Sequence, residues 1–430
     1  MLKQKGSRIH NMANKVSKNI ILSNFPALRH RNYRLFWFGQ CISLIGTWMQ
    51  NIGQSWLVLQ LTHSALKLSI VTMVQFLPMM FFALFAGTLV DRFPKRKVLI
   101  FTQSSLGVLA AILASLTYFK VVQYWHLLVL ALLLGVVNTL DMPTRQSFFV
   151  ELVGKEDLMN AIALNSSIFN LARMLGPAVA GLLIGLVGIA VCFYINALSF
   201  LAVIAGLWMI SIPTQIISNN SVDSFKHIIP DIFEGLRYIR GKEIILQPLL
   251  LLAVTSTFVM NFNVLIPVFA KQNLSQNATG YGFLMTCMGI GSFIGALTLA
   301  ARSKAGPKLK YLVGGAIVMS TFLALLGLEK DYKLACITLF IIGFSSITFT
   351  ALVNSTIQLN SADNMRGRVM SVYSLVFGGV TPIGSLFAGN TSEYVGAPSC
   401  MIISGIIGIV ATLYIILMLC KGHYKRNISI

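Results

Sequence analysis

Two oppositely charged residues stand four positions apart inside an apolar stretch of this chain. Asp141 and Arg145 would share one face of a helix, where a carboxylate and a guanidinium can form a hydrogen-bonded ion pair. A third charge, Arg173, lies inside a later apolar stretch. A charge at the centre of a bilayer costs at least ~2.5–3.5 kcal/mol, so all three side chains should face protein or water and be paired. They predict a proton or charge network in the interior of the chain.

The surroundings of these charges are apolar enough to lie in a membrane. Of the 430 residues, 56% are hydrophobic and only 11% are charged, with a mean hydropathy of +0.77. These values exclude an ordinary soluble domain and are typical of a polytopic membrane protein. Twelve apolar segments reach the ~20 residues that a helix needs to cross a bilayer. They cover residues 35–60, 66–90, 98–119, 124–148, 159–186, 189–212, 245–270, 279–301, 311–328, 333–358, 368–389 and 395–420.

The order of these segments predicts an all-α polytopic membrane protein with 12 transmembrane helices in two six-helix halves. Gly135 and then Pro177 in the first half, and Gly343 and then Pro382 in the second, recur at similar offsets, which indicates parallel repeats. The expected domains are a basic cytoplasmic tail (1–34), an N-terminal half (35–212), a cytoplasmic linker (213–244), a C-terminal half (245–420) and a second cytoplasmic tail (421–430). Within the linker, residues 225–239 should form an amphipathic helix.

The distribution of cations predicts the orientation. Twenty-six of the 33 Lys and Arg residues fall on one side of this arrangement and only five on the other. By the positive-inside rule both termini are cytoplasmic, and we expect a multi-pass protein of the cell inner membrane. The net charge of +20 is explained by these membrane ends, so no nucleic-acid partner is expected. The basic N-terminal tail should lie on anionic membrane lipid.

A short charged turn joins two helices within residues 82–100. Its spacing, G-x-L-x-D-R-x-x-x-R-K, is formed by Gly87, Leu89, Asp91, Arg92, Arg96 and Lys97. The motif resembles the loop between helices 2 and 3 of the major facilitator superfamily, whereas an ordinary charged hairpin has no use for Asp91. We expect the Asp91 carboxylate to bond to the positive N-terminal end of segment 368–389, near Gly367 and Arg368, when the cytoplasmic side is closed.

Small residues form a second pattern, in segment 159–186. Gly176, Pro177, Ala180 and Gly181 resemble the G-P-x-x-G-G antiporter motif of exporters in the same superfamily, with Ala180 in place of one glycine. The alternative is small-residue helix packing with a proline kink.

The resemblance extends over residues 26–420 and narrows to one branch of the superfamily. Residues 26–29 (PALR), 61–65 (LTHSA), 143–146 (PTRQ) and 366–368 (RGR) resemble the branch that contains enterobactin exporters and macrolide efflux proteins. It implies the major facilitator fold and a secondary active transporter that exports a small organic solute by alternating access, with protons as the coupling ion and a siderophore as the favoured substrate. A macrolide or multidrug efflux pump, a lysophospholipid transporter and a non-transporting receptor or scaffold stay open as alternatives.

Polar side chains inside the segments are candidates for the substrate cavity, because the first, fourth, seventh and tenth helices line the cavity in facilitator-type transporters. Segment 35–60 carries an amide-rich stripe. Segment 245–270 offers Thr257, Asn261 and Asn263, and segment 333–358 offers Ser346, Thr350 and Asn354. The candidates are Gln40, Ser43, Thr47, Gln50, Asn51, Gln54, Asn261 and Asn354. The alternative is hydrogen bonding between packed helices, worth ~0.6 kcal/mol per contact. The cavity is favoured for the long stripe, and the two interpretations are even for Asn261 and Asn354.

Enzymatic and metal chemistry find no support in the sequence. H-E-x-x-H, G-x-S-x-G and Walker motifs are absent, and the six cysteines form no C-x-x-C pair, so we expect no cofactor and no metal site. The energy should come from an ion gradient in a monomeric protein. Asp141 either carries the proton or belongs to a fixed network with Arg92, Arg96 or Arg145 that braces the gate, and the second role is slightly favoured.

Overall fold

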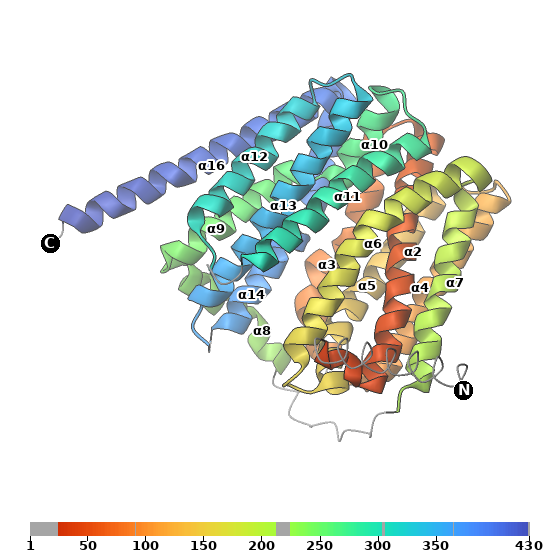
Figure 1. The fold of residues 1–430 in the computed structure, drawn as a ribbon, viewed down its shortest axis with the longest axis horizontal. Helices are drawn as coiled ribbons and strands as arrows, with labels where there is room; N and C mark the ends of the chain where they lie inside the picture. The colour runs from red at the N-terminus through yellow and green to blue at the C-terminus, as the bar shows by residue number, and fades with distance from the viewer. Residues whose placement is uncertain (1–24, 91, 212–223, 303–305, 364, 429–430) are drawn as a thin grey trace, which may run out of the picture.

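The computed structural model describes residues 25–90, 92–211, 224–302, 306–363 and 365–428 of the chain. Within these ranges every regular element is helical, and the helices form two halves that lie side by side in Figure 1. The N-terminal half contains η1 (Pro26–Arg29), α2 (Arg31–Thr62), α3 (Ala65–Val90), α4 (Lys95–Tyr118), α5 (Tyr124–Val153), α6 (Leu158–Val187) and α7 (Ile189–Met209). After α8 (Ser224–Arg240), the C-terminal half contains α9 (Glu243–Val254), η2 (Thr255–Val259), α10 (Phe262–Gln272), α11 (Ala278–Ala301), α12 (Leu309–Leu326), α13 (Tyr332–Asn360), α14 (Arg366–Ser374), η4 (Leu375–Gly379), α15 (Thr381–Val395) and α16 (Ala397–Ile428).

The membrane-spanning character of the helices agrees with the sequence. In the described chain, 11 helices are long and apolar enough to cross a bilayer. The remaining predicted span, α2, has 32 residues and so has the length, but its polar side chains lower its hydropathy. The all-α, two-half architecture is therefore confirmed. α2 differs because it carries three of the six buried Asn and Gln side chains of the described residues, namely Gln40, Gln50 and Gln54.

Two predicted spans are interrupted by a π-helical turn. Segment 245–270 is divided into α9 and α10 by η2, and segment 368–389 into α14 and α15 by η4. In the first, the Asn261 side chain donates to the Thr257 carbonyl at 2.7 Å and so satisfies a backbone group near the break. In the second, Gly378 and Gly379 weaken the helix and Pro382 lacks a backbone donor. Single continuous helices were expected at both places, and local backbone chemistry overrides that expectation.

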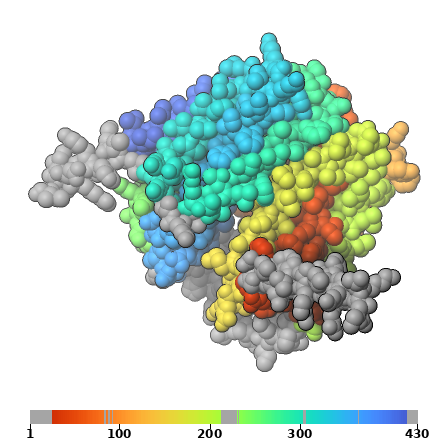
Figure 2. Space-filling view, viewed as in Figure 1, coloured from red at the N-terminus to blue at the C-terminus, as the bar shows by residue number. Residues whose placement is uncertain are grey.

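The halves meet along two pairs of helices. α3 packs against α15, and α6 packs against α11. Figure 2 shows the surfaces of α6 (yellow) and α11 (teal) meeting along the front of the molecule. Any substrate path between the halves is therefore flanked by these two seams.

Two glycines set the close approach of helices inside each half. A Cβ atom at Gly135 would lie 2.1 Å from the Gln75 carbonyl oxygen of α3, and one at Gly343 would lie 2.0 Å from the Met288 carbonyl oxygen of α11. Only glycine permits backbones to cross so closely. The α3–α5 and α11–α13 crossings are thus the same structural device repeated in the two halves.

The two ends of the bundle differ in charge. We call one the basic end; it carries η1, the turn between α3 and α4, α8, and the connection from α11 to α12. The opposite end carries the connections from α2 to α3, from α6 to α7 and from α10 to α11.

Candidate functional site

The charges singled out by the sequence form a buried network in the N-terminal half. The Asp141 side chain is almost fully buried, with the residue 1% exposed, and its Oδ2 is bonded by the Arg145 guanidinium one turn away on α5. Its Oδ1 accepts hydrogen bonds from Thr102 Oγ1 at 2.7 Å and Gln103 Nε2 at 2.8 Å, both on α4. The predicted ion pair is present, and it is joined by two donors that the sequence analysis did not identify.

Arg145 extends the network to a third helix. Its Nη1 donates to Gln40 Oε1 on α2 at 2.8 Å, so α2, α4 and α5 are connected through one carboxylate. Arg96, proposed as another partner of Asp141, is placed elsewhere: it donates to the Leu207 and Trp208 carbonyls at the end of α7, at 2.7 and 2.9 Å. Arg96 starts α4 and reaches sideways to α7, whereas Asp141 lies deeper in the bundle.

This geometry fits a brace better than a proton carrier. Both oxygens of Asp141 already accept hydrogen bonds, and one is paired with a guanidinium. A proton on either oxygen would displace a donor or leave the partly buried Arg145 guanidinium without its anionic partner, which is unfavourable. The network still holds two buried donors without a protein partner in the described chain, Gln40 Nε2 and Arg145 Nε.

Arg173 is separate from this network. Its guanidinium lies 5.9 Å from the centre of the Trp48 ring on α2, a cation–π contact, and Trp48 meets Phe169 edge-on. Its Nε is buried and has no hydrogen-bond partner among the described residues. Arg173 is therefore paired, as expected, but its partner is the face of an aromatic ring. Its Nε–H group remains able to donate to an acceptor.

Part of the predicted amide stripe does line a cavity. Asn51 and Gln54 of α2 border a small polar cavity of about 50 Å³, together with Thr72 and Gln75 of α3 and Asn263 of α10. Gln54 Nε2 donates to Gln75 Oε1 at 3.4 Å. Both halves contribute to this cavity, because Asn263 belongs to the C-terminal half. Gln75 and Thr72 were not predicted as site residues; their signal was polar side chains in the apolar segment 66–90.

Four other cavity candidates are bonded to neighbouring protein groups. Gln50 accepts a hydrogen bond from Asn196 of α7 at 2.6 Å, and Thr47 bonds the Ser43 carbonyl on its own helix at 2.9 Å. Asn354 Oδ1 accepts a hydrogen bond from Gln358 on the same helix, α13, at 2.7 Å. Asn261 donates to the Thr257 carbonyl, as described above. Only the Gln50–Asn196 bond joins two helices and so supports hydrogen bonding between packed helices; the bonds of Thr47, Asn261 and Asn354 are local to their own spans.

The small-residue motif of α6 lies between two neighbours. On one side, a Cβ atom at Gly176 would come within 2.4 Å of the Trp48 side chain of α2. On the other, Gly181 faces Gly282 of α11, whose own Cβ would lie 2.7 Å from the Gly181 Cα. Pro177 and Ala180 are buried between them. The motif therefore brings the two halves into backbone contact, which is what a rocking interface needs.

The gating motif is only partly described. Asp91 lies outside the described residues, so its bond to the start of α14 stays a prediction. Among the other members, Leu89 borders an apolar groove between α3 and α5, and Lys97 is exposed. Arg368, the expected neighbour of Asp91, donates to Glu234 of α8 at 2.9 Å.

The halves are held together at the opposite end. Glu393 of α15 accepts hydrogen bonds from Ser64 Oγ at 3.0 Å and from the Leu66 amide at 3.1 Å, at the start of α3. Lys271 of α10 donates to the Leu59 carbonyl of α2 at 2.7 Å, beside stacked Trp56 and Tyr281 rings. These contacts join the halves at that end, and the sequence analysis did not identify them because they link residues more than 200 positions apart.

Comparison with known proteins fits this arrangement. A family profile described as "transmembrane secretion effector" matches residues 22–426. The chain belongs to this family of major facilitator transporters. Members are membrane transporters of small molecules rather than enzymes, as the sequence predicted.

Relatives of this transporter include named exporters. It is 28% identical over 390 residues to the staphyloferrin A transporter of Staphylococcus aureus, covering 88% of this chain and 94% of the relative. It is 26% identical over 349 residues to the multidrug efflux pump Tap of Mycolicibacterium fortuitum, covering 79% of this chain and 84% of the relative. The fold is similar to that of an inward-facing bacterial homologue of the human lysosomal transporter Spinster, with a TM-score of 0.70 at 11% identity over 90% of this chain and 96% of that one.

Proposed function

We propose that this transporter exports a siderophore across the cytoplasmic membrane by alternating access, driven by proton antiport. The observation that carries the substrate class is the 28% identity to the staphyloferrin A transporter, which extends over 88% of this chain. Both termini would then be cytoplasmic and the basic end would face the cytoplasm.

The chemistry of the interior supports an acceptor-rich, anionic solute. Gln40 Nε2, Arg145 Nε and Arg173 Nε are buried donors without a protein partner in the described chain. A siderophore presents oxygen atoms that such donors can bind. The polar cavity bordered by Asn51, Gln54 and residues of the other half adds hydrogen-bonding groups beside the closed end.

Alternating access is supported by the seams between the halves. The Gly181–Gly282 contact lets α6 and α11 rotate against each other at close range. The bonds of Glu393 to the start of α3 hold the halves together at the opposite end. In the exchange of states, those bonds would break and the basic end would close, with Asp91 approaching the start of α14. In this scheme Asp141 positions α2, α4 and α5 and is not the proton carrier.

A second candidate is multidrug efflux. The 26% identity to Tap over 79% of this chain favours it, and aromatic residues such as Trp48 and Phe169 beside Arg173 suit an apolar, bulky solute. A lysophospholipid transporter and a non-transporting scaffold are the remaining alternatives to be separated by experiment.

The test is deletion of the gene, followed by mass spectrometry of the medium under iron starvation. We expect the extracellular siderophore to fall at least tenfold and to return when the wild-type gene is supplied. Unchanged siderophore with a raised sensitivity to macrolides and other drugs would instead establish the efflux alternative. The control is the Gly181→Leu variant, in which the added side chain blocks the close approach of the halves. It should be present in the membrane and should restore no siderophore export to the deleted strain.

A further inference from the structure

A groove of about 500 Å³ opens on the C-terminal half between α11, α12 and α13, close to the basic end. Three cations stand around it: Arg302 at the end of α11, and Lys308 and Lys310 at the start of α12. All three side chains are exposed. The groove lies away from the polar cavity and from the Asp141 network, and the proposed transport function does not use it.

These cations have no acidic partner in the part of the chain that the structure describes. No described ion pair includes any of the three, and the residues lining the groove contain neither Asp nor Glu. Lys310 lies over the Tyr311 ring, 5.2 Å from its centre, a cation–π contact that supplies no negatively charged group. The groove is therefore complementary to an anion.

The walls of the groove are mostly apolar, with Thr298, Ser345 and Thr348 as polar members. Leu299 of α11, Val318 of α12 and Leu352 of α13 line the groove as it runs from the basic end into the bundle. Gly314 of α12 also lines the groove, and the space beside it is empty, because a Cβ atom there would meet nothing within 4 Å. A free anion would use the cations but not these walls, whereas an amphiphile uses both.

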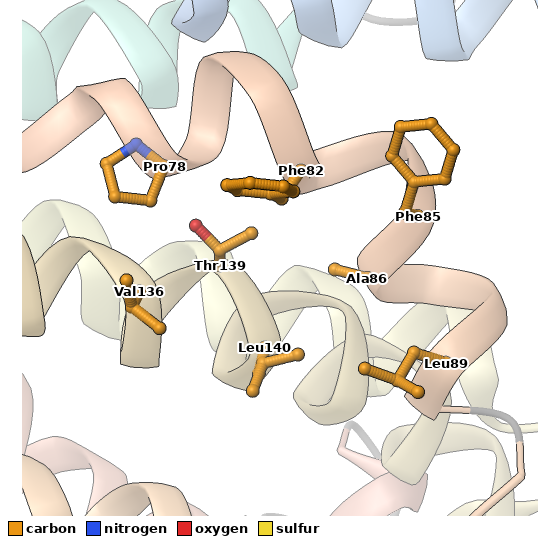
Figure 3. Close-up of a pocket in the computed structure, with 8 residues that line it drawn as sticks. All are labelled: Pro78, Phe82, Phe85, Ala86, Leu89, Val136, Thr139 and Leu140. Carbon is orange, nitrogen blue, oxygen red and sulfur yellow. The ribbon is translucent and has the colours of Figure 1, made fainter.

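The N-terminal half has a groove of its own between two helices, and that groove carries no charge. It lies between α3 and α5, holds about 280 Å³, and is lined by Pro78, Phe82, Phe85, Ala86, Leu89, Val136, Thr139 and Leu140, with no charged residue (Figure 3). No residue of α4 lines this groove, whereas α12 lines the C-terminal groove and the start of α12 supplies Lys308 and Lys310. The cations of the C-terminal groove therefore come from the way the start of α12 borders it.

We propose that the C-terminal groove binds one phospholipid with an anionic headgroup, taken from the leaflet at the basic end. The phosphate lies between Arg302, Lys308 and Lys310, and an acyl chain follows the wall formed by Leu299 and Val318. Basic pockets between transmembrane helices on the cytoplasmic side suit such headgroups. The lipid is a resident ligand that joins the end of α11 to the start of α12, and it is not the transported solute.

The test measures binding of defined lipids to the delipidated full-length protein in detergent, by native mass spectrometry and by the thermal unfolding midpoint. Phosphatidylglycerol is compared with phosphatidylcholine of the same acyl chains, and with inorganic phosphate and glycerol 3-phosphate as soluble anions. We expect phosphatidylglycerol to bind at least tenfold more tightly than phosphatidylcholine and to raise the midpoint, while the soluble anions do neither.

Variants locate the effect. Each Lys or Arg near an anionic headgroup is worth a factor of about five, so Arg302→Gln, Lys308→Gln and Lys310→Gln together should weaken phosphatidylglycerol binding by roughly a hundredfold. The control removes three exposed cations elsewhere at the same end, Lys155→Gln, Arg237→Gln and Arg240→Gln, and should keep the preference. Gly314→Leu keeps all cations, fills the apolar part of the groove and should also weaken binding, even if the triple variant fails to fold.

Three results would overturn the proposal. Equal binding of the two lipids would remove the role of charge. An equal loss in the control triple variant would make the effect one of net charge rather than of this groove. Displacement of phosphatidylglycerol by phosphate or glycerol 3-phosphate, with Gly314→Leu unchanged, would identify a site for a soluble anion instead.

Discussion

The two halves share a backbone plan but use their cations differently. In the N-terminal half, Arg96 at the start of α4 donates to two carbonyls at the end of α7 and so ties the third predicted span to the sixth. In the C-terminal half, Lys308 and Lys310 stand at the equivalent start of α12, beside the open groove. The N-terminal half thus uses a cation at this turn to bond the end of a neighbouring helix, whereas the cations of the C-terminal half stay available to the proposed lipid.

The two seams between the halves differ in the same way. The α6–α11 seam is close packing of small residues, with Gly181 against Gly282 and Thr279 Oγ1 donating to the Gly181 carbonyl at 2.9 Å. The α3–α15 seam is closed at the opposite end by the Glu393 carboxylate at the start of α3. Packing suits a pivot, while a carboxylate bonded to two donors suits a contact that breaks and forms again.

The largest effect is expected where the halves are alike. Gly135→Leu and Gly343→Leu each place a side chain into a backbone crossing, where the first added atom would lie 2.1 or 2.0 Å from a carbonyl oxygen. Overpacking of a well-packed interior costs about 1–3 kcal/mol or more, so both variants should lose monodisperse protein on size-exclusion chromatography. Gly314→Leu, in open space, should elute as wild type. A stable Gly343→Leu beside an unstable Gly135→Leu would break the equivalence of the two crossings.

The next effect concerns the buried network, which has no described counterpart of the same composition in the C-terminal half. Asp141→Asn leaves the Arg145 guanidinium, whose side chain is 21% exposed, without its partner. Breaking a fully buried pair costs about 3–5 kcal/mol, and the partial exposure of Arg145 lowers that cost. Downhill substrate exchange and accumulation driven by a pH gradient should therefore fall together, by at least tenfold, in proteoliposomes.

The control for Asp141 is the double variant Asp141→Asn with Arg145→Gln, which removes both charges and should recover part of both activities. A proton carrier gives a different pattern: downhill exchange survives in Asp141→Asn and only pH-driven accumulation disappears. That outcome would reject the bracing role.

A smaller effect should separate the two basic turns. Arg96→Gln removes charged hydrogen bonds to the Leu207 and Trp208 carbonyls, and should lower the unfolding midpoint in detergent by a few degrees. Lys308→Gln, in the C-terminal half, should leave the midpoint of delipidated protein unchanged because no described ion pair is lost. Equal shifts of the unfolding midpoint in both variants would mean that the cations of the two turns contribute equally to stability.

How far the sequence predicts this structure depends on the range of each interaction. The spans and the Asp141–Arg145 pair follow from spacing along one helix, so they are predicted correctly. Thr102 and Gln103 join Asp141 from another helix, and spacing alone cannot place α4 against α5.

The amide stripe shows a second limit of the sequence. Its members share a helix face within about 100°, yet Gln50 turns to Asn196 while Asn51 and Gln54 border the cavity. One residue of spacing turns a side chain by about 100° around the helix, so only the positions of the neighbouring helices decide which amides face the cavity. The breaks at η2 and η4 likewise depend on local bonds such as that of Asn261, which no apolar pattern reveals.

The smallest effect is expected at the seam closed by charge. Glu393→Gln keeps an oxygen acceptor for Ser64 but loses the negative charge beside the positive start of α3, an interaction worth about 0.3–1 kcal/mol. Hydrogen–deuterium exchange of the Leu66 amide should accelerate about twofold to fivefold. Thr279→Val, on the packed seam, should leave that amide unchanged, and an unaltered rate in Glu393→Gln would deny Glu393 a part in closing this end.

The most direct measurement of the central claim is transport by the purified protein. Proteoliposomes are loaded with buffer, given an external siderophore on the side of the basic end, and subjected to an imposed pH gradient. We predict that siderophore accumulates against its concentration gradient, that a protonophore abolishes the accumulation, and that Gly181→Leu vesicles accumulate none. Vesicles that contain well-folded wild-type protein and move no siderophore under any imposed gradient would contradict the account.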